Sequence, residues 1–155
     1  MPAQPPLVDF LIIGAPKAAT TWLADSLREH PGVFIPAAKE LRYFCGTHLH
    51  RGLDWYRAQL AEGVRGQQRI GEASPSYFGS AEAIERIHAL LPGCRLIVSL
   101  RHPVDQAYSF YWHQLSRGQL PASTRFVDFF REQRPRAGYY GRRMEHVLAC
   151  FPQAQ

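Results

Sequence analysis

One short stretch, residues 14–22, holds the residue types best able to do chemistry and reads GAPKAATTW. It follows an apolar run, residues 7–13, that is typical of a strand buried in a parallel sheet. It precedes a helical apolar pattern that opens at Thr20 and stops at Pro31. The first N–H groups and the positive dipole end of that helix, Lys17 and two threonine hydroxyls would therefore face one place. The arrangement predicts a site for phosphate or sulfate.

The same stretch also has an ordinary explanation, because a strand-to-helix turn can simply carry a surface lysine. It does not match the Walker A loop of nucleoside-triphosphate hydrolases, which requires a glycine directly before its lysine. Here Lys17 precedes the small pair Ala18 and Ala19 instead of following a glycine. The sequence therefore disfavours a nucleoside-triphosphate hydrolase.

Arg101 and Ser109 form a second candidate pair, eight residues apart. Arg101 follows an apolar run, residues 94–100, that predicts a second buried strand, and Pro103 fits the first position of the next helix. Ligands of open α/β sheets bind beyond the carboxyl ends of the strands. If the two strands are near neighbours, Lys17 and Arg101 can reach one nucleotide with two separated anionic groups. The ordinary alternatives are a solvated arginine and a serine bonded to its own helix backbone.

Strand and helix patterns alternate along the chain. With 155 residues, 46% of them hydrophobic, the chain can bury one core, and we expect a single domain spanning residues 1–155. The pattern predicts further extended segments at 33–36 and 69–72, and helices at 52–61, 81–91, 103–115, 126–132 and 141–150. This order is typical of an α/β fold with a parallel sheet flanked by helices.

Charge and cysteine content narrow the choice of partners and compartment. The net charge of +5 favours anionic ligands, but the basic residues are scattered and no nucleic-acid motif appears. Cys45, Cys94 and Cys150 are far apart and lack metal spacing, which favours a reducing compartment. The N-terminus shows no signal-peptide pattern, and no apolar stretch reaches the roughly 20 residues of a membrane span. We therefore expect a cytoplasmic protein without nucleic-acid partners; oligomeric state is not indicated.

Two motifs, GAPKAATTW (14–22) and LRHPVDQAYSFY (100–111), resemble the two cofactor motifs of sulfotransferases that use 3′-phosphoadenosine 5′-phosphosulfate (PAPS). The resemblance implies a sulfotransferase fold like that of P-loop nucleoside triphosphatases. It also implies that the first motif holds the 5′-phosphosulfate, and the second the 3′-phosphate, through Arg101 and Ser109. Trp22 matches the family residue near the adenine, although a buried helix tryptophan would explain it equally. The implied cofactor-binding residues of the first motif are Pro16, Lys17, Ala18, Ala19, Thr20, Thr21 and Trp22.

Two more segments, GLDWY (52–56) and GEASPSYF (71–78), resemble the glycosaminoglycan-type branch of that family and its bacterial relatives. The resemblance implies that Glu72 is the catalytic base, whereas without it a solvated strand-end glutamate would be the simpler interpretation. Lys17 would stabilise charge on the bridging oxygen as 3′-phosphoadenosine 5′-phosphate (PAP) departs. Other branches use histidine, so the alternative bases are His48, His50 and His113. No residue pattern requires a metal.

The chain departs from the family pattern at Ala19, which replaces a glycine, and at Ala73, which replaces a lysine often found after the glutamate. The family domain is also longer and continues with another strand, further helices and a late glycine-rich loop, so the resemblance implies that this chain is an N-terminal portion of the domain. We expect transfer of a sulfuryl group from PAPS to a hydroxyl or amine of a carbohydrate or small molecule, giving PAP. The alternatives are a non-catalytic module that binds PAPS or PAP, a nucleotide-dependent phosphotransferase, and an anion-dependent interaction protein.

Overall fold

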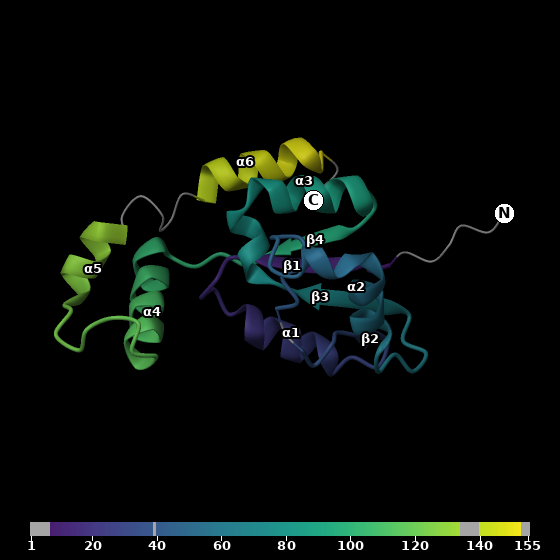
Figure 1. The fold of residues 1–155 in the computed structure, drawn as a ribbon, viewed down its shortest axis with the longest axis horizontal. Coiled ribbons are helices and arrows are strands. Elements are labelled where there is room, and N and C mark those ends of the chain that lie inside the picture. Colours follow the sequence, from purple (N-terminus) through teal and green to yellow (C-terminus); the bar gives the residue numbers. More distant parts are fainter. Residues whose placement is uncertain (1–6, 39, 134–139, 153–155) are drawn as a thin grey trace.

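A four-stranded parallel sheet forms the centre of the molecule, in the computed structural model that describes residues 7–38, 40–133 and 140–152 (Figure 1). Its strands are β1 (Phe10–Gly14), β2 (Val33–Phe34), β3 (Arg69–Ala73) and β4 (Arg95–Val98), in the order β2-β3-β1-β4. Every pairing is parallel, and Phe10 of β1 is opposite Gly71 on one side and Arg95 on the other. The predicted α/β fold with a parallel sheet is confirmed.

Six helices surround this sheet in the described part of the chain. Their bounds are α1 (Thr20–Arg28), α2 (Gly52–Ala61), α3 (Ala81–Leu90), α4 (Pro103–Ser116), α5 (Phe126–Gln133) and α6 (Tyr140–Cys150), with short 3-10 turns η1 (Leu49–Arg51) and η2 (Pro75–Gly79). The helix ends lie within about two residues of the predicted ones. The predicted start signals are present in the structure: Pro103 begins α4, and the Ser80 hydroxyl caps α3 by accepting a hydrogen bond from the Ala83 N–H at 3.2 Å.

The core lies on both faces of β1, whose residues are all buried. Leu11 and Ile13 pack in a large cluster with α2, α3 and α6, whereas Phe10 and Ile12 pack in a smaller cluster with α1. Alternate residues of a strand point to opposite faces, so this division shows that β1 is covered on both sides. A continuous apolar run is what such a strand requires.

The strand β4 was predicted to be buried, and this prediction is wrong. It lies at the edge of the described sheet, with Arg95 exposed and Leu96, Ile97 and Val98 only half-buried. An apolar run of this length occurs in central and edge strands alike, so the sequence pattern did not distinguish them.

The helices α4 and α5 pack on one another beside the sheet instead of over it (Figure 1). On α4 only Ala107 and Tyr111 are buried, while Val104, Tyr108 and Trp112 are 44–49% exposed. No helix among the described residues is long and apolar enough to cross a membrane. Residues 1–6, where the sequence predicts no signal peptide, lie outside the described part.

Candidate functional site

The loop between β1 and α1 has a backbone shaped for an anion. Lys17 has a φ of 64° and Ala19 a φ of 60° with ψ 20°, so both adopt the left-handed conformation. Left-handed residues within a tight turn direct successive backbone N–H groups into one concavity, and the first N–H groups of a helix lack acceptors within the helix. Ala19 immediately precedes α1, so both sources of N–H groups meet at residues 17–22.

The side chains of this loop differ in exposure. Thr20 is buried and Lys17 half-buried, whereas Ala19 and Thr21 are exposed. The side chain of Trp22 is 70% exposed, which excludes the buried-tryptophan interpretation and leaves its ring accessible to a ligand. The position of Ala19 is the one where the family pattern has glycine, and its left-handed φ gives the physical reason for that glycine.

Arg101 follows β4, and Ser109 lies on α4. Because β4 is hydrogen-bonded directly to β1, Lys17 and Arg101 follow the carboxyl ends of two neighbouring strands. The contact between the two segments is close: the Ala15 N–H donates to the Ser99 carbonyl at 2.7 Å. Arg101 is exposed and Ser109, on α4, is half-buried. The segments that carry Lys17 and Arg101 therefore meet at the carboxyl ends of β1 and β4.

Glu72 lies in β3, on the other side of β1, and its register partner is Leu11. It is only 1% exposed, so the interpretation as a solvated strand-end glutamate is wrong. Its Oε1 accepts a hydrogen bond from the Ser74 hydroxyl, and its Oε2 accepts one from the Tyr56 hydroxyl at 3.4 Å. Burial raises the pKa of Glu72 from 4.5 to about 7, although the hydrogen bond from Ser74 opposes that rise. Burial therefore favours the neutral acid form of this carboxyl relative to an exposed glutamate.

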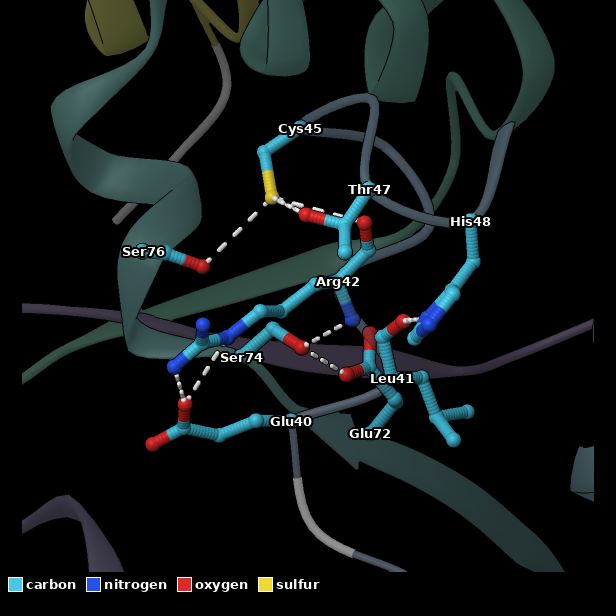
Figure 2. Close-up of polar contacts among 9 residues, drawn as sticks. All are labelled: Glu40, Leu41, Arg42, Cys45, Thr47, His48, Glu72, Ser74 and Ser76. Atoms are coloured by element: carbon cyan, nitrogen blue, oxygen red, sulfur yellow. Dashed lines mark hydrogen bonds and ion pairs between the residues drawn. The ribbon is translucent and has the colours of Figure 1, made fainter. Parts of the chain in front are cut away.

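A loop, residues 40–48, covers this carboxyl (Figure 2). The Glu40 N–H donates to the Ala73 carbonyl at 3.0 Å, and the Arg42 N–H donates to the Ser74 hydroxyl at 3.0 Å. Glu40 and Arg42 form an ion pair with each other, and both have positive φ, at 62° and 49°. These bonds hold the loop over Glu72, which is thus enclosed by protein.

The three alternative bases occupy different surroundings. His48 binds the Leu41 carbonyl through Nδ1 at 2.7 Å and packs on Trp55, so it fastens the covering loop. His50 is exposed in η1. His113 is half-buried on α4, and partial burial together with the nearby Lys17 ammonium lowers its pKa. Of these three histidines, His113 is therefore the one that lies within electrostatic range of Lys17 in the loop between β1 and α1.

The decisive comparison is with the sulfotransferase domain family, whose pattern matches residues 7–155. The chain belongs to this family. Human heparan sulfate glucosamine 3-O-sulfotransferase 6 is 36% identical over 150 residues, which cover 92% of this chain and 43% of the human protein. The bifunctional heparan sulfate N-deacetylase/N-sulfotransferase of Drosophila melanogaster is 30% identical over 182 residues, covering 96% of this chain and 17% of that protein.

A solved structure agrees with this sulfotransferase assignment. The sulfotransferase from Alicyclobacillus acidocaldarius superimposes with a TM-score of 0.77 and 28% identity, over 96% of this chain and 70% of that one. The predicted fold and family are confirmed together. The chain spans less than half the length of the heparan sulfate relatives named above.

Several residues of this candidate site were not predicted. Tyr56 and Ser74 donate hydrogen bonds to Glu72, Gln106 and Ser99 donate to carbonyls of the loop between β1 and α1, and the Arg42 N–H donates to Ser74. Tyr56 and Ser74 lie within the GLDWY and GEASPSYF motifs and could have been found there, whereas the others meet their partners only through the fold. Across the described residues, no three His, Cys, Asp or Glu side chains gather as a metal site, and independence from metals stays a prediction.

Proposed function

We propose that this sulfotransferase-family chain binds PAPS and transfers its sulfuryl group to a hydroxyl or amine of a carbohydrate or small-molecule acceptor, giving PAP. The observation that carries the proposal is that Lys17, in its left-handed loop, and Arg101 follow the carboxyl ends of two strands that pair directly. A donor with a 5′-phosphosulfate and a 3′-phosphate matches two separated cationic groups at one sheet edge. The relatives' names add support, since one specifies 3-O-sulfation of heparan sulfate glucosamine and the other N-sulfation of heparan sulfate.

The donor would be held by the cofactor-binding residues predicted from the sequence. We assign the 5′ end to the loop of Pro16, Lys17, Ala18 and Ala19 with the hydroxyls of Thr20 and Thr21 beyond it, and the adenine to the exposed face of Trp22. Arg101 and Ser109 would bind the 3′-phosphate. An arginine forms forked, charge-assisted hydrogen bonds to such a group.

Sulfuryl transfer is an in-line displacement in which positioning and charge stabilisation dominate, by analogy with phosphoryl transfer. The acceptor oxygen or nitrogen forms a bond to sulfur while the bond from sulfur to the bridging phosphate oxygen breaks. The proton of the acceptor passes to the Glu72 carboxylate, and the Lys17 ammonium stabilises the negative charge left on the bridging oxygen. Glu72 is poised for this exchange because burial brings its pKa to about 7.

The setting of this activity is also a proposal. The three cysteines, Cys45, Cys94 and Cys150, are all free, which supports a reducing compartment such as the cytoplasm. We propose that transfer needs no metal ion, so a chelator is not expected to affect it. Membership of the sulfotransferase family weighs against the phosphotransferase alternative.

The first test is calorimetric binding of PAP and AMP to the wild-type chain. One charge-assisted contact to the 3′-phosphate predicts about a tenfold to hundredfold preference for PAP. Arg101→Ala should remove this preference, while Arg131→Ala, an exposed arginine on α5, should retain it. Equal binding of PAP and AMP by the wild type would contradict the proposed donor site.

The second test is sulfuryl transfer from PAPS to glucosamine-containing acceptors. Loss of a general base predicts a fall of roughly 10²–10⁴-fold in Glu72→Gln, with PAP binding retained. Retained PAP binding without wild-type turnover would instead support the non-catalytic binding module.

A further inference from the structure

The anion-binding loop has its carbonyl oxygens held by hydrogen bonds from within the protein. The Gln106 amide donates through Nε2 to the Pro16 carbonyl at 3.1 Å, across a sequence separation of 90 residues. The Ser99 hydroxyl donates to the Ala18 carbonyl at 2.7 Å, and the Ala18 N–H donates to the Ala15 carbonyl at 3.3 Å. Three of the oxygens in residues 15–18 therefore accept bonds from named donors.

The direction of a carbonyl fixes the direction of the N–H that follows it. A trans peptide is planar, and its C=O and N–H point in opposite directions. Drawing the Pro16 oxygen toward Gln106 therefore turns the Lys17 N–H away from Gln106 on α4, and drawing the Ala18 oxygen toward Ser99 turns the Ala19 N–H away from Ser99. Lys17 and Ala19 are the two left-handed residues of the loop. An anion is attracted by such N–H groups and repelled by carbonyl oxygens.

We propose that Gln106 is a positioning residue for the 5′ end of the donor: it holds the Pro16 carbonyl outward so that the Lys17 N–H faces the anion. This inference rests on the proposed function and deepens it. Gln106 lies on α4 between Arg101 and Ser109, so one segment both binds the 3′-phosphate and shapes the loop for the 5′ end. The side chain touches no reacting atom, and its role is carried through the loop.

A simpler role for Gln106 is that of an anchor, which only holds α4 against the loop that follows β1. The two roles predict different results with different ligands. An anchor affects AMP, 3′-AMP and PAP equally, because it positions α4 as a whole. A positioning residue affects the ligands with a 5′-phosphate and spares 3′-AMP, whose phosphate would meet Arg101 and Ser109.

The experiment compares Gln106→Leu with wild type and with Gln114→Leu, a matched change about two turns further along α4. Affinities for AMP, 3′-AMP and PAP are measured by NMR titration of backbone amides, with thermal unfolding as a check on the fold. Loss of a single hydrogen bond of this kind predicts about a tenfold weaker affinity of Gln106→Leu for AMP and PAP. The affinity for 3′-AMP should change less than twofold, as should every affinity in Gln114→Leu. The amide shifts of Lys17 and Ala19 should move in the ligand-free variant.

Each other outcome counts against the inference. If Gln106→Leu weakens the affinities for all three ligands equally, Gln106 is an anchor. If the affinities are unchanged, or the amide shifts of Lys17 and Ala19 do not move, Gln106 does not position the loop. A wild-type chain that binds no nucleotide overturns the proposed function itself, and the inference with it. If the wild-type chain prefers PAP and Gln106→Leu has the same affinities, the proposed function is supported and only the inference about Gln106 is overturned.

Discussion

Replacement of Glu72 by glutamine removes a titrating group that is fully enclosed by protein. Burial raises the pKa of Glu72 from its ordinary 4.5 to about 7 in the folded chain. The folded state therefore binds more protons than the unfolded state between these values, and the wild-type free energy of unfolding falls as pH rises through this window. A pKa difference of one unit corresponds to about 1.4 kcal/mol, so the wild-type free energy of unfolding falls by about 3 kcal/mol once the pH exceeds 7. Glutamine keeps the size and the acceptor oxygen without the charge.

The assay is urea unfolding of wild type and Glu72→Gln at pH 4.5, 6 and 8. We expect the difference between the two free energies to be small at pH 4.5 and to favour the variant by about 3 kcal/mol at pH 8. Other titrating groups are shared by both chains and cancel in the difference. Glu62→Gln, an exposed glutamate at the end of α2, serves as control, and its curve should run parallel to that of wild type.

Parallel curves for wild type and Glu72→Gln would refute the reasoning, because they would mean that Glu72 is solvated. The same titration can be followed at the carboxyl carbon by NMR, with a midpoint expected near 7. In Ser74→Ala this midpoint should move upward, because the hydroxyl of Ser74 stabilises the charged form. A downward movement would show that the hydrogen bond acts on the neutral acid instead.

Two further predictions concern the backbone of the anion loop. Ala19→Gly should stabilise the fold by about 0.5–1 kcal/mol in urea unfolding, because relief of a left-handed alanine exceeds the entropic cost of glycine in the unfolded chain; a lower stability would contradict the assigned φ. Gly14→Ala should destabilise it by about 2–3 kcal/mol, since the new Cβ would lie 2.5 Å from the Phe78 Cβ and 3.0 Å from the Pro75 oxygen. Thermal melts unchanged from wild type would show that η2 can move aside.

The sequence predicted those parts of the site that depend on local signals. Short local patterns predict three boundaries: the end of β1, the start of α1, and the start of α4 at Pro103. The rule that ligands bind beyond the carboxyl ends of parallel strands predicted that Lys17 and Arg101 could reach one ligand if their strands were near neighbours. The pairing of β1 with β4 confirms the condition on which that prediction depended.

The remaining parts depend on contacts between distant segments. The motif located Glu72, but its burial comes from Tyr56 on α2 and from the loop that contains Arg42. No local sequence pattern predicts that a side chain is enclosed by distant segments, so the position of Glu72 at a strand end alone suggested a solvated glutamate. The exposure of β4 has the same origin, because strand order is set by the whole sheet and not by the residues of one strand.

The position of β1 within the sheet bears on how this chain is made. Its first residue, Phe10, pairs with Gly71 and with Arg95, both of which are synthesised much later. Non-local parallel pairing is slow, because the entropy of closing long loops is lost before any contact forms. During translation the apolar residues of β1 therefore leave the ribosome long before either neighbouring strand, and they depend on chaperones or on transient collapse until β4 has emerged.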